Sequence, residues 1–327
     1  MTENPQLSII TPCFNEDESI FKCYQSLKEV MLRDLPGVTY EHIFADNSST
    51  DRTVEEIKKF AINDSRVKLI VNSKNIGAPK NIYRALARTN GSAVIPMLPA
   101  DLQDPAEVIP EFYREWKSGT LIVFGQRIDR QEHMLMRALR SMYYRIIKKF
   151  ASSDIPINAG EFMLIDRKVV DLLVDMNESN PYLRGLIAQV GVKSSYVNYR
   201  WGRREYGKSK ATPFVLIDTA INGLISTSRL PARFALLSGF MFSLIGILLG
   251  LWSLITSVFS NSPIGSGIPT IILAVLFIGG VQLFFLGLIG EYVLSIHGEI
   301  RPEPGAFDLE TIGFEALGDG DGDGDAS

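Results

Sequence analysis

The chain has 327 residues, 46% of them hydrophobic, and a formal net charge of −4 at pH 7. Residues 303–327 hold eight acidic residues and no Lys or Arg, so residues 1–302 carry 33 basic against 29 acidic side chains. Residues 1–302 are therefore mildly basic, and the negative overall charge does not exclude the binding of anionic ligands. Two cysteines, Cys13 and Cys23, exclude a disulfide framework and fit a reducing compartment.

Several common site classes lack their signatures. The three histidines, at 42, 133 and 297, are too far apart to form a zinc-binding pattern. There is no Gly-x-x-x-x-Gly-Lys-(Ser/Thr) loop and no Gly-x-Gly-x-x-Gly fingerprint. These absences argue against nucleotide hydrolysis and dinucleotide redox chemistry.

Apolar runs and helical patterns alternate along the first half of the chain. The runs predict buried strands at residues 7–12, 42–45, 67–71, 93–98 and 121–124. Helices are predicted at residues 18–32, 53–62, 80–89 and 105–117. This alternation predicts right-handed βαβ units, and hence an α/β fold with a mostly parallel sheet and flanking helices.

The stretch from Val94 to Pro105 is central to the functional reading. Asp101 and Gln103 follow the fourth predicted strand, and Asp104 is placed to cap the next helix, with Pro105 at its first position. A carboxylate and an amide oxygen two residues apart can share one hard cation that also binds substrate phosphates. The alternative is a plain strand–turn–helix connection whose acids only cap.

Polar loops follow three of the predicted strands, at residues 12–16, 46–51 and 101–104. Strand ends on one edge of a parallel sheet meet at one crevice, where open α/β sheets bind ligands. Taken together, the three loops predict a nucleotide-sugar site.

Ala100-Asp-Leu-Gln-Asp-Pro105 resembles the metal loop of family 2 glycosyltransferases, in the branch of dolichol-phosphate mannose synthases and bacterial polyprenyl-phosphate (bactoprenol) glycosyltransferases. Pro99 stands where that branch carries a further Asp. The segments 11–16, 45–53 and 75–77 are similar to the family's nucleotide-sugar loops. The resemblance implies a metal at Asp101 and Gln103, a catalytic role for Asp101, and nucleotide-sugar contacts from Pro12, Phe14, Glu16, Asp46, Asn47 and Asn75. Ordinary packing is the alternative for Phe14, and Asp51 reads better as a helix cap.

Two later segments also resemble the family. Residues 158–168 are similar to its Gly-Asp-Phe-x-Leu-x-Asp-Arg-Lys segment, with Glu161 in place of the usual Asp, and this implies a catalytic carboxylate. Residues 204–210 match its Arg-x-x-Gly-x-Ser-Lys signature. Predicted lipid-phosphate contacts are Arg127, Arg204, Ser209 and Lys210. In the alternative for Glu161, that carboxylate only holds a neighbouring Arg such as Arg127. No nucleic-acid partner is expected, because no basic stripe with stacking aromatics accompanies the cluster.

The last third of the chain predicts membrane contact. Phe234–Phe259 and Ile268–Gly290 are each long enough to span a core of ~30 Å, and the short linker between them makes a hairpin. Flanking arginines at 229, 233 and 301 predict both termini and the catalytic domain in the cytoplasm. Residues 211–233 read as interfacial helix, with a core helix as the alternative, and residues 126–150 as a basic helix, either solvated or on the membrane. The Gly-Asp repeat at 318–325 should be disordered.

The predicted organisation has four parts: a GT-A-like catalytic domain over 1–210, an interfacial region over 211–233, two transmembrane helices over 234–290, and a cytoplasmic segment with an acidic tail over 291–327. Glycines in the predicted spans permit association into a homo-oligomer.

The resemblance implies an inverting enzyme that moves a sugar from a nucleoside diphosphate to undecaprenyl or dolichyl phosphate at the bilayer, with Mg or Mn. The alternatives are a processive polysaccharide synthase and a degenerate scaffold of a membrane complex. Two spans and the absence of Gln-x-x-Arg-Trp after Glu161 argue against the synthase. Pro99 and Glu161 leave the scaffold open.

Overall fold

The computed structural model describes residues 4–128, 159–178, 181–202, 268–300 and 306–314, together with 237–242 and isolated positions between 244 and 255. The chain divides into two compact units. One comprises Met1–Arg137, Ile155–Lys210 and Pro304–Ser327, and the other comprises Ala138–Asp154 and Ala211–Glu303. The C-terminal residues therefore belong with the N-terminal unit.

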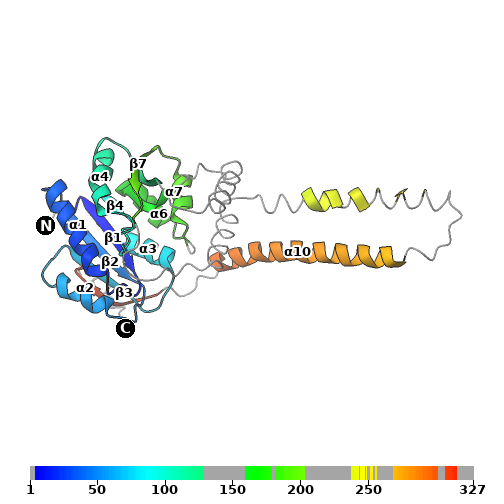
Figure 1. Ribbon diagram of the computed structural model, residues 1–327, viewed down its shortest axis with the longest axis horizontal. Helices are drawn as coiled ribbons and strands as arrows, with labels where there is room; N and C mark the ends of the chain where they lie inside the picture. The colour runs from blue at the N-terminus through cyan, green and yellow to red at the C-terminus, as the bar shows by residue number, and fades with distance from the viewer. Residues whose placement is uncertain are drawn as a thin grey trace, which may run out of the picture. The chain divides into compact units, whose positions relative to one another are not determined.

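The first unit is built on an eight-stranded sheet in the order β7-β5-β6-β4-β1-β2-β3-β8 (Figure 1). Its strands are β1 Leu7–Cys13, β2 Tyr40–Asp46, β3 Val67–Asn72, β4 Ala93–Ile95, β5 Ile122–Ile128, β6 Ala159–Asp166, β7 Ser194–Arg200 and β8 Asp308–Ile312. β1 is parallel to β2 and β4, β2 to β3, and β5 to β7. β6 runs antiparallel between β4 and β5, and β8 runs antiparallel to β3. Six strands of this sheet therefore run in one direction and β6 and β8 run against them, so the sheet is mixed but mostly parallel, as predicted.

The predicted helices of the first half are confirmed. They are α1 Ile20–Asp34, α2 Thr53–Ala61, α3 Ala78–Leu86 and α4 Ile109–Lys117, and α6 Arg167–Asp175 and α7 Leu183–Val190 follow later in the chain. The helix predicted from residue 105 begins instead with a short 3-10 turn, η1 Ala106–Val108, which carries no side-chain cap. The predicted capping role of Asp104 is wrong, because its carboxylate bonds to Arg127 and Tyr199.

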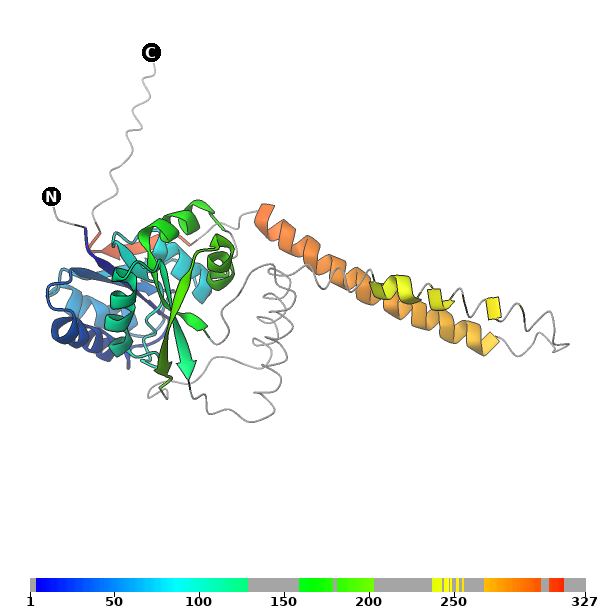
Figure 2. The same cartoon turned by 90° about the horizontal axis from the view of Figure 1, so that it is seen from above.

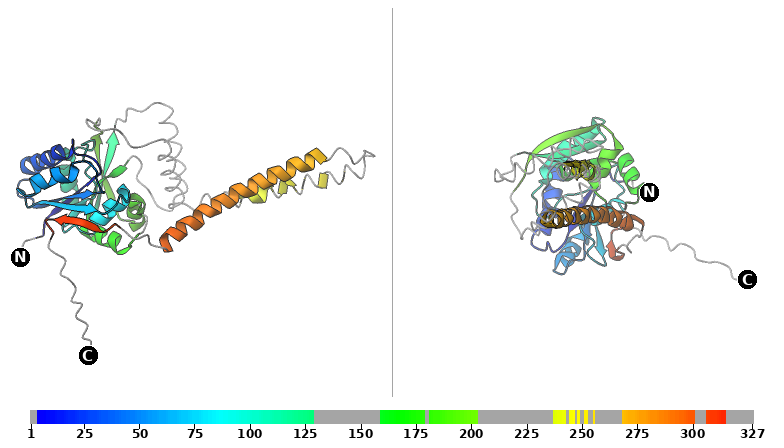
Figure 3. Two further views of the ribbon diagram at one scale, coloured as in Figure 1. Left: turned by 90° about the horizontal axis from the view of Figure 1, so that it is seen from below. Right: turned by 90° about the vertical axis from the view of Figure 1, so that its right-hand side faces the viewer.

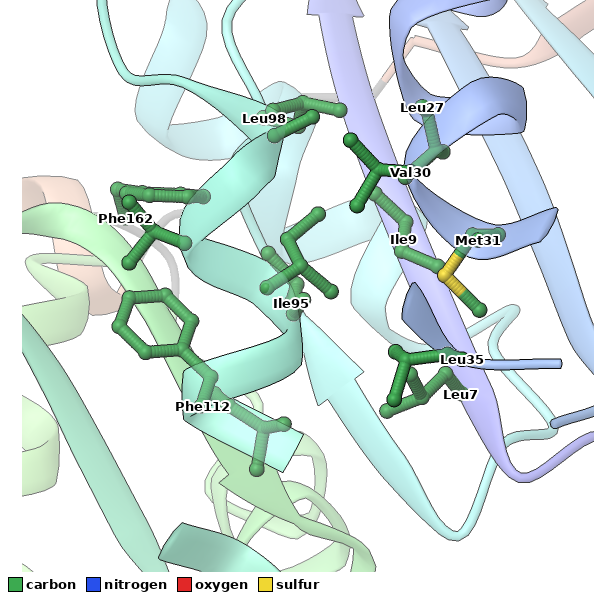
Figure 4. Packing of buried hydrophobic residues seen from close by; sticks show 14 of the residues in the cluster. Leu7, Ile9, Leu27, Val30, Met31, Leu35, Ile95, Leu98, Phe112 and Phe162 are labelled. Carbon is green, nitrogen blue, oxygen red and sulfur yellow. The ribbon is translucent and has the colours of Figure 1, made fainter. Parts of the chain in front are cut away.

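The helices cover the two faces of the sheet in two groups. Side chains of α1 and α4 pack on one face around Leu7 and Ile9, with Phe112 and Phe162 at the same interface (Figure 4). α2 joins α1 on that side through a cluster around Phe44. α3, α6 and α7 cover the other face around Ile10. Alternate residues of β1 thus point into opposite layers, as the period of a strand requires.

Two prolines limit the central strands. β4 ends at Ile95, directly before Pro96, which has no amide hydrogen to donate to a ladder. Pro12 lies inside β1, but β4 pairs with β1 only through Leu7–Ile9. The missing amide of Pro12 therefore costs no hydrogen bond to β4, and the ends of these strands open into loops.

Strand β8 was not predicted. It returns from the C-terminal part of the chain and pairs with β3 at the sheet edge (Figure 3). Gly313 follows it with φ +78°, and a Cβ there would lie 3.0 Å from the carbonyl oxygen of Val67. Glycine is needed at this close approach.

The described part of the second unit contains α10 Ile268–Ile300, one continuous helix (Figure 2). It contains the second predicted span and continues past it. One window of it, Phe277–Leu294, is long and apolar enough to cross a membrane, which is weak evidence for a span. In the first predicted span, the described residues include a shorter apolar helix at Leu237–Gly246. Residues 129–150 of the basic segment, the interfacial region and the Gly-Asp repeat lie outside the described residues.

Candidate functional site

The parallel strands β1, β2 and β3 end at one edge of the sheet. Cys13 pairs with Asp46, and Asp46 pairs in turn with Val71, so the three strands reach this edge in register. Of the six predicted nucleotide-sugar residues, four lie in the loops that follow: Phe14, Glu16, Asn47 and Asn75. The other two, Pro12 and Asp46, lie at the ends of β1 and β2. The structure therefore brings these loops together, as predicted from strand order.

Asn47 and Asn75 join the second and third loops. Asn47 Nδ2 donates to Asn75 Oδ1 over 2.9 Å, and the Ile76 amide donates to Asn47 Oδ1 over 3.0 Å. Asn75 Oδ1 also accepts from the Gly77 amide over 3.0 Å. Asn47 is buried and Asn75 is exposed, so the pair has one side chain in the protein and one at the surface.

The first and second loops are joined through Asn15. Its amide donates to Ser49 Oγ over 2.9 Å, and its Oδ1 accepts from the Thr50 amide over 2.7 Å. Asn15 has φ +56°, a conformation that asparagine tolerates better than most residues. The sequence reading missed Asn15, although its position inside the Phe14–Glu16 segment was a signal.

Asp46 is fully buried and turned toward Ser49. Its carboxylate accepts from the Ser49 amide over 2.9 Å and from the Ser49 hydroxyl. Burial raises the pKa of Asp46, and the bonds from Ser49 oppose this rise. Its predicted contact with the nucleotide is untested, and in this arrangement it shapes the second loop.

Glu16 and Asp51 both bond near the start of α2. The Glu16 amide donates to Thr53 Oγ1 over 2.8 Å, and Glu16 Oε2 accepts from Ser19 Oγ over 3.0 Å. Asp51 Oδ1 accepts from the Thr53 amide over 2.9 Å. Asp51 thus acts as a capping group from the position before the formal N-cap, Arg52.

The loop after β4 folds back on itself at Asp101. Asp101 Oδ1 accepts from the Gln103 amide over 3.1 Å, and the Leu102 amide donates to the Pro99 carbonyl over 3.1 Å. Leu102 takes φ +55° in this tight turn. Burial raises the pKa of Cys23 to about 12, and smaller contributions come from Asp101 and Glu16. The Cys23 thiol lies 3.9 Å from the Pro99 carbonyl oxygen, so α1 contacts this loop.

The loop after β4 is also bonded to the end of β7. The Gly202 amide donates to the Gln103 carbonyl over 2.9 Å. Asp104, almost fully buried, accepts from Arg127 Nε over 3.0 Å and from Arg127 Nη2 over 2.7 Å. Tyr199 donates its hydroxyl to Asp104 over 2.6 Å. Burial and Asp104 raise the pKa of Tyr199, so its hydroxyl stays protonated as a donor.

Arg127 occupies the centre of this second group. Its guanidinium lies 4.9 Å from the centroid of the Trp201 ring, and a Cβ on Gly160 would lie 3.2 Å from Nη2. Its predicted contact with a lipid phosphate is untested. The two bonds that Arg127 donates to the Asp104 carboxylate fix the orientation of its guanidinium.

Glu161 lies beside this group, at the start of β6. Burial raises the pKa of its carboxyl, and the charges of Arg184 and Arg127 oppose the rise. The alternative in which Glu161 only holds a neighbouring Arg stays open: Asp104 accepts the two bonds from Arg127, but Arg184 also acts on Glu161. The positive charge of Arg127 therefore acts on Glu161, but burial has the larger effect and the pKa of the carboxyl stays raised.

The residues around Asp101 fit a divalent cation only in part. Within the ranges that the structure covers, no group of three or more His, Cys, Asp or Glu side chains could hold a metal ion. Asp101 and Gln103 supply one carboxylate and one amide, and Pro99 supplies no ligand side chain. A hard cation bound here would take its remaining ligands from a diphosphate and from water, which is the usual mode for Mg²⁺.

Of the predicted lipid-phosphate residues, Arg204, Ser209 and Lys210 lie outside the described part of the chain. Sequence reasoning missed Tyr199 and Trp201, and gave Asp104 only a capping role. These three residues are linked through Arg127 by contacts between segments far apart in the sequence. A local sequence pattern does not record such contacts.

Comparisons with known proteins bear on the family of this chain. The model of glycosyl transferase family 2 matches residues 8–173. The uncharacterized glycosyltransferase YkcC of Bacillus subtilis is 34% identical over 96% of this chain and 97% of its own length. The SfII prophage-derived bactoprenol glucosyl transferase of Shigella flexneri is 32% identical over 91% of this chain and 96% of its own length.

Among solved structures, the mannosyltransferase PcManGT from Pyrobaculum calidifontis, in complex with GDP-Man and Mn²⁺, is 16% identical. It covers 74% of this chain and 81% of its own, with a TM-score of 0.42. The family match and the long sequence relatives, rather than this structure, carry the assignment: the chain belongs to glycosyl transferase family 2 and is a glycosyltransferase.

Proposed function

We propose that this glycosyltransferase moves a sugar from a nucleoside diphosphate to a polyprenyl phosphate, with inversion, at the cytoplasmic face of a membrane. The observation that carries the proposal is the bond between Gln103 and Gly202. It joins the candidate metal loop to the strand end after which, in sequence, the basic motif at 203–210 begins. Relatives named bactoprenol glucosyl transferases, about as long as this chain, support the acceptor class.

In the proposed reaction, an oxygen of the lipid phosphate attacks the anomeric carbon from the face opposite the diphosphate. The new carbon–oxygen bond forms as the bond to the diphosphate breaks, and the nucleoside diphosphate leaves with the electron pair. Arg127 would hold the acceptor phosphate in a fixed orientation. Glu161, with its raised pKa, would take the proton from a singly ionised phosphate.

A cation of the Mg²⁺ or Mn²⁺ class at Asp101 and Gln103 would neutralise the departing diphosphate. The protein's own part is to hold that loop in place. The turn at Leu102, the Pro99 carbonyl and the contact with Gly202 all restrain it. Asp101 therefore needs no second acidic neighbour to keep its position.

Chain connectivity supports an anchor of two spans. The first unit contains residues on both sides of the second unit, since the chain leaves it after Lys210 and returns at Pro304. If α10 crosses a membrane, the chain must cross it an even number of times, because β8 lies in the same sheet as β3. A second crossing then falls between 211 and 267, where the apolar run 234–259 lies.

A turnover assay tests the proposal. The purified full-length protein is mixed with a polyprenyl phosphate and, in separate reactions, each of a panel of nucleotide sugars with Mg²⁺ or Mn²⁺. The expected product is a lipid-linked single sugar, with an anomeric configuration opposite to that of the donor by NMR. A long polymer made without lipid phosphate would indicate a processive synthase. No transfer from any donor would indicate a scaffold.

A further inference from the structure

Strand β8 contacts more than the sheet edge. Its register places Asp308 beside Asn72, the last residue of β3, after an irregularity in the ladder. The hydrogen bonds then continue past β3: the Ser73 amide donates to the Phe307 carbonyl over 2.9 Å, and the Phe307 amide donates to Ser73 Oγ over 3.1 Å. The pairing therefore reaches into the loop 73–77, which carries Asn75.

Asp308 holds the helix on the other side of that loop. Its Oδ1 accepts from Arg84 Nη2 over 2.6 Å, and its Oδ2 accepts from Arg88 Nη2 over 2.7 Å. The Asp308 side chain is 16% exposed, and those of Arg84 and Arg88 are 26% and 30% exposed. Partial burial makes these charged bonds stronger than surface ion pairs. The segment Phe307–Asp308 therefore holds residue 73 at the start of the loop and also the C-terminal end of α3, the helix that follows the loop.

The position of this loop sets the geometry of two candidate donor residues. Asn75 accepts from Asn47, and the Ile76 amide donates back to Asn47. Any shift of residues 73–77 must therefore stretch these bonds or move Asn47 with them. Asn47 lies at the end of β2, beside Asp46, so the effect extends to the second loop of the donor site.

The first half of β8 is held by polar bonds rather than by burial. Phe307 is 66% exposed and Leu309 is 60% exposed, whereas Ile312 packs on the cluster around Phe44. Removing the charge of Asp308 should therefore loosen the contact with the loop while the far end of the strand stays packed. This separates a positioning role from a purely structural one.

We infer that β8 is a brace for the donor site, and that Asp308 is a positioning residue for the nucleotide sugar. The inference rests on the proposed function for the identity of that ligand. It gives Asp308, which follows the last residue of α10, Ile300, by eight positions, an indirect role in donor binding. The membrane helix and the donor loop are then joined by one short stretch of chain.

The test compares Asp308→Asn with Glu310→Gln in the full-length protein. Asp308→Asn keeps the shape of the side chain and loses its charge, so the KM for nucleotide sugar should rise about five- to thirtyfold, the usual cost of weakening a charged contact. The turnover number and the KM for lipid phosphate should stay within about twofold. Glu310→Gln removes the neighbouring pair with Lys58, which is more exposed, and should change none of the three.

Asp308→Glu keeps the charge and should recover part of the donor affinity. A lower turnover number with unchanged donor KM would overturn the inference, and so would equal changes in both KM values. Should Asp308→Asn fail to fold, Arg88→Gln removes one of the same two bonds and is expected to raise the donor KM by a smaller factor.

A second measurement does not depend on the reaction. Hydrogen exchange of the amides at 73–77 should be faster in Asp308→Asn than in the wild type, while exchange in β1 stays the same. If the wild type transfers no sugar to lipid phosphate, the proposed function fails. The exchange measurement still tests whether β8 holds the loop 73–77 in place. Unchanged exchange at 73–77 would refute the brace even in an active enzyme.

Discussion

Asp104 and Arg127 form a two-bond ion pair across the sheet, with Nε–Oδ1 at 3.0 Å and Nη2–Oδ2 at 2.7 Å. The Asp104 side chain is 2% exposed and that of Arg127 is 16% exposed. The pair links the loop after β4 to the end of β5, and Tyr199 adds the end of β7. Three elements that carry candidate site residues therefore share one buried carboxylate.

The first prediction follows from this burial. Asp104→Asn leaves a guanidinium without its counter-charge and should destabilise the protein by about 3–5 kcal/mol. Arg127→Met alone should also destabilise it, but the double variant should lose less than the sum, because the two residues are coupled. Thermal unfolding of the four proteins in one detergent measures the cycle. Additive losses would show that the pair is not coupled.

The second prediction concerns the metal loop. Asp101→Asn removes the one carboxylate that the loop offers a cation, so turnover should fall by about two orders of magnitude or more with no change in unfolding temperature. Glu107→Gln, an exposed acid on the following 3-10 turn, is the matched control and should remain active. The assignment is wrong if both Asp101→Asn and a chelator leave activity unchanged.

The third prediction concerns Glu161 and pH. Burial raises the pKa of this carboxyl, so its proton-accepting form is lost at a higher pH than for an ordinary glutamate. A lipid phosphate, with a second pKa of roughly 6, needs the base most when it is still protonated. Glu161→Gln should therefore lose most activity at about pH 6 and approach the wild type by about pH 8.

Two controls separate this effect from unfolding. A raised folded-state pKa means that the stability from the protonated carboxyl is lost as pH rises through that pKa. Gln mimics the protonated form, so Glu161→Gln should not lower the unfolding temperature at pH 8. Glu161→Asp keeps a carboxylate and should retain activity at pH 6. An equal loss for Glu161→Gln at both pH values would leave only an orienting role.

The fourth prediction concerns His42, a buried residue of β2. Burial lowers its pKa to about 3, and its Nε2 lies 2.8 Å from Thr11 Oγ1. The depressed pKa contributes stability that is present above the unfolded pKa of about 6.5 and is lost as pH falls toward 3. Between pH 7 and pH 5 the loss should be about 2 kcal/mol. Thermal unfolding should show a weaker pH dependence in His42→Gln, and an identical dependence would count against this assignment.

The fifth prediction concerns topology. If both ends of the proposed anchor lie on the cytoplasmic side, a cysteine at Ser262 should react with an impermeant maleimide only from outside, and one at Ser209 only from inside. Cys13 and Cys23 are both buried, so the native protein gives little background. The reverse pattern would show the opposite orientation. Labelling of both positions from the same side would rule out the hairpin.

Most strands buried on both faces could be predicted from the sequence, although β6, with Phe162–Ile165 fully buried, was not. β1 and β2 are buried along almost their whole length and therefore form apolar runs. β7 and β8 are edge strands, and β7 alternates between buried and exposed residues. An edge strand such as Asp308-Leu-Glu-Thr-Ile312 becomes a strand because its neighbour offers a free ladder, which local sequence does not record.

The candidate site, like the sheet, could be predicted only in part from the sequence. The loops at strand ends follow from the order of elements, and the structure brings them together. Asp104 shows why the rest could not be predicted. An Asp before a Pro at a helix start suits a cap, and only the arrival of Arg127, 23 residues later, gives the carboxylate a stronger partner. Whether a carboxylate such as that of Asp104 caps a helix or pairs with an arginine therefore depends on contacts between segments far apart in the sequence.

The return of the chain through β8 affects how a water-soluble catalytic fragment should be made. A gene shortened before the apolar segments would delete β8 and expose the free edge of β3, a template for aggregation. A flexible linker joining residue 210 to residue 304 would bypass the hydrophobic insertion and keep the whole sheet. Such a fused fragment should stay soluble and bind nucleoside diphosphate, whereas the shortened one should precipitate.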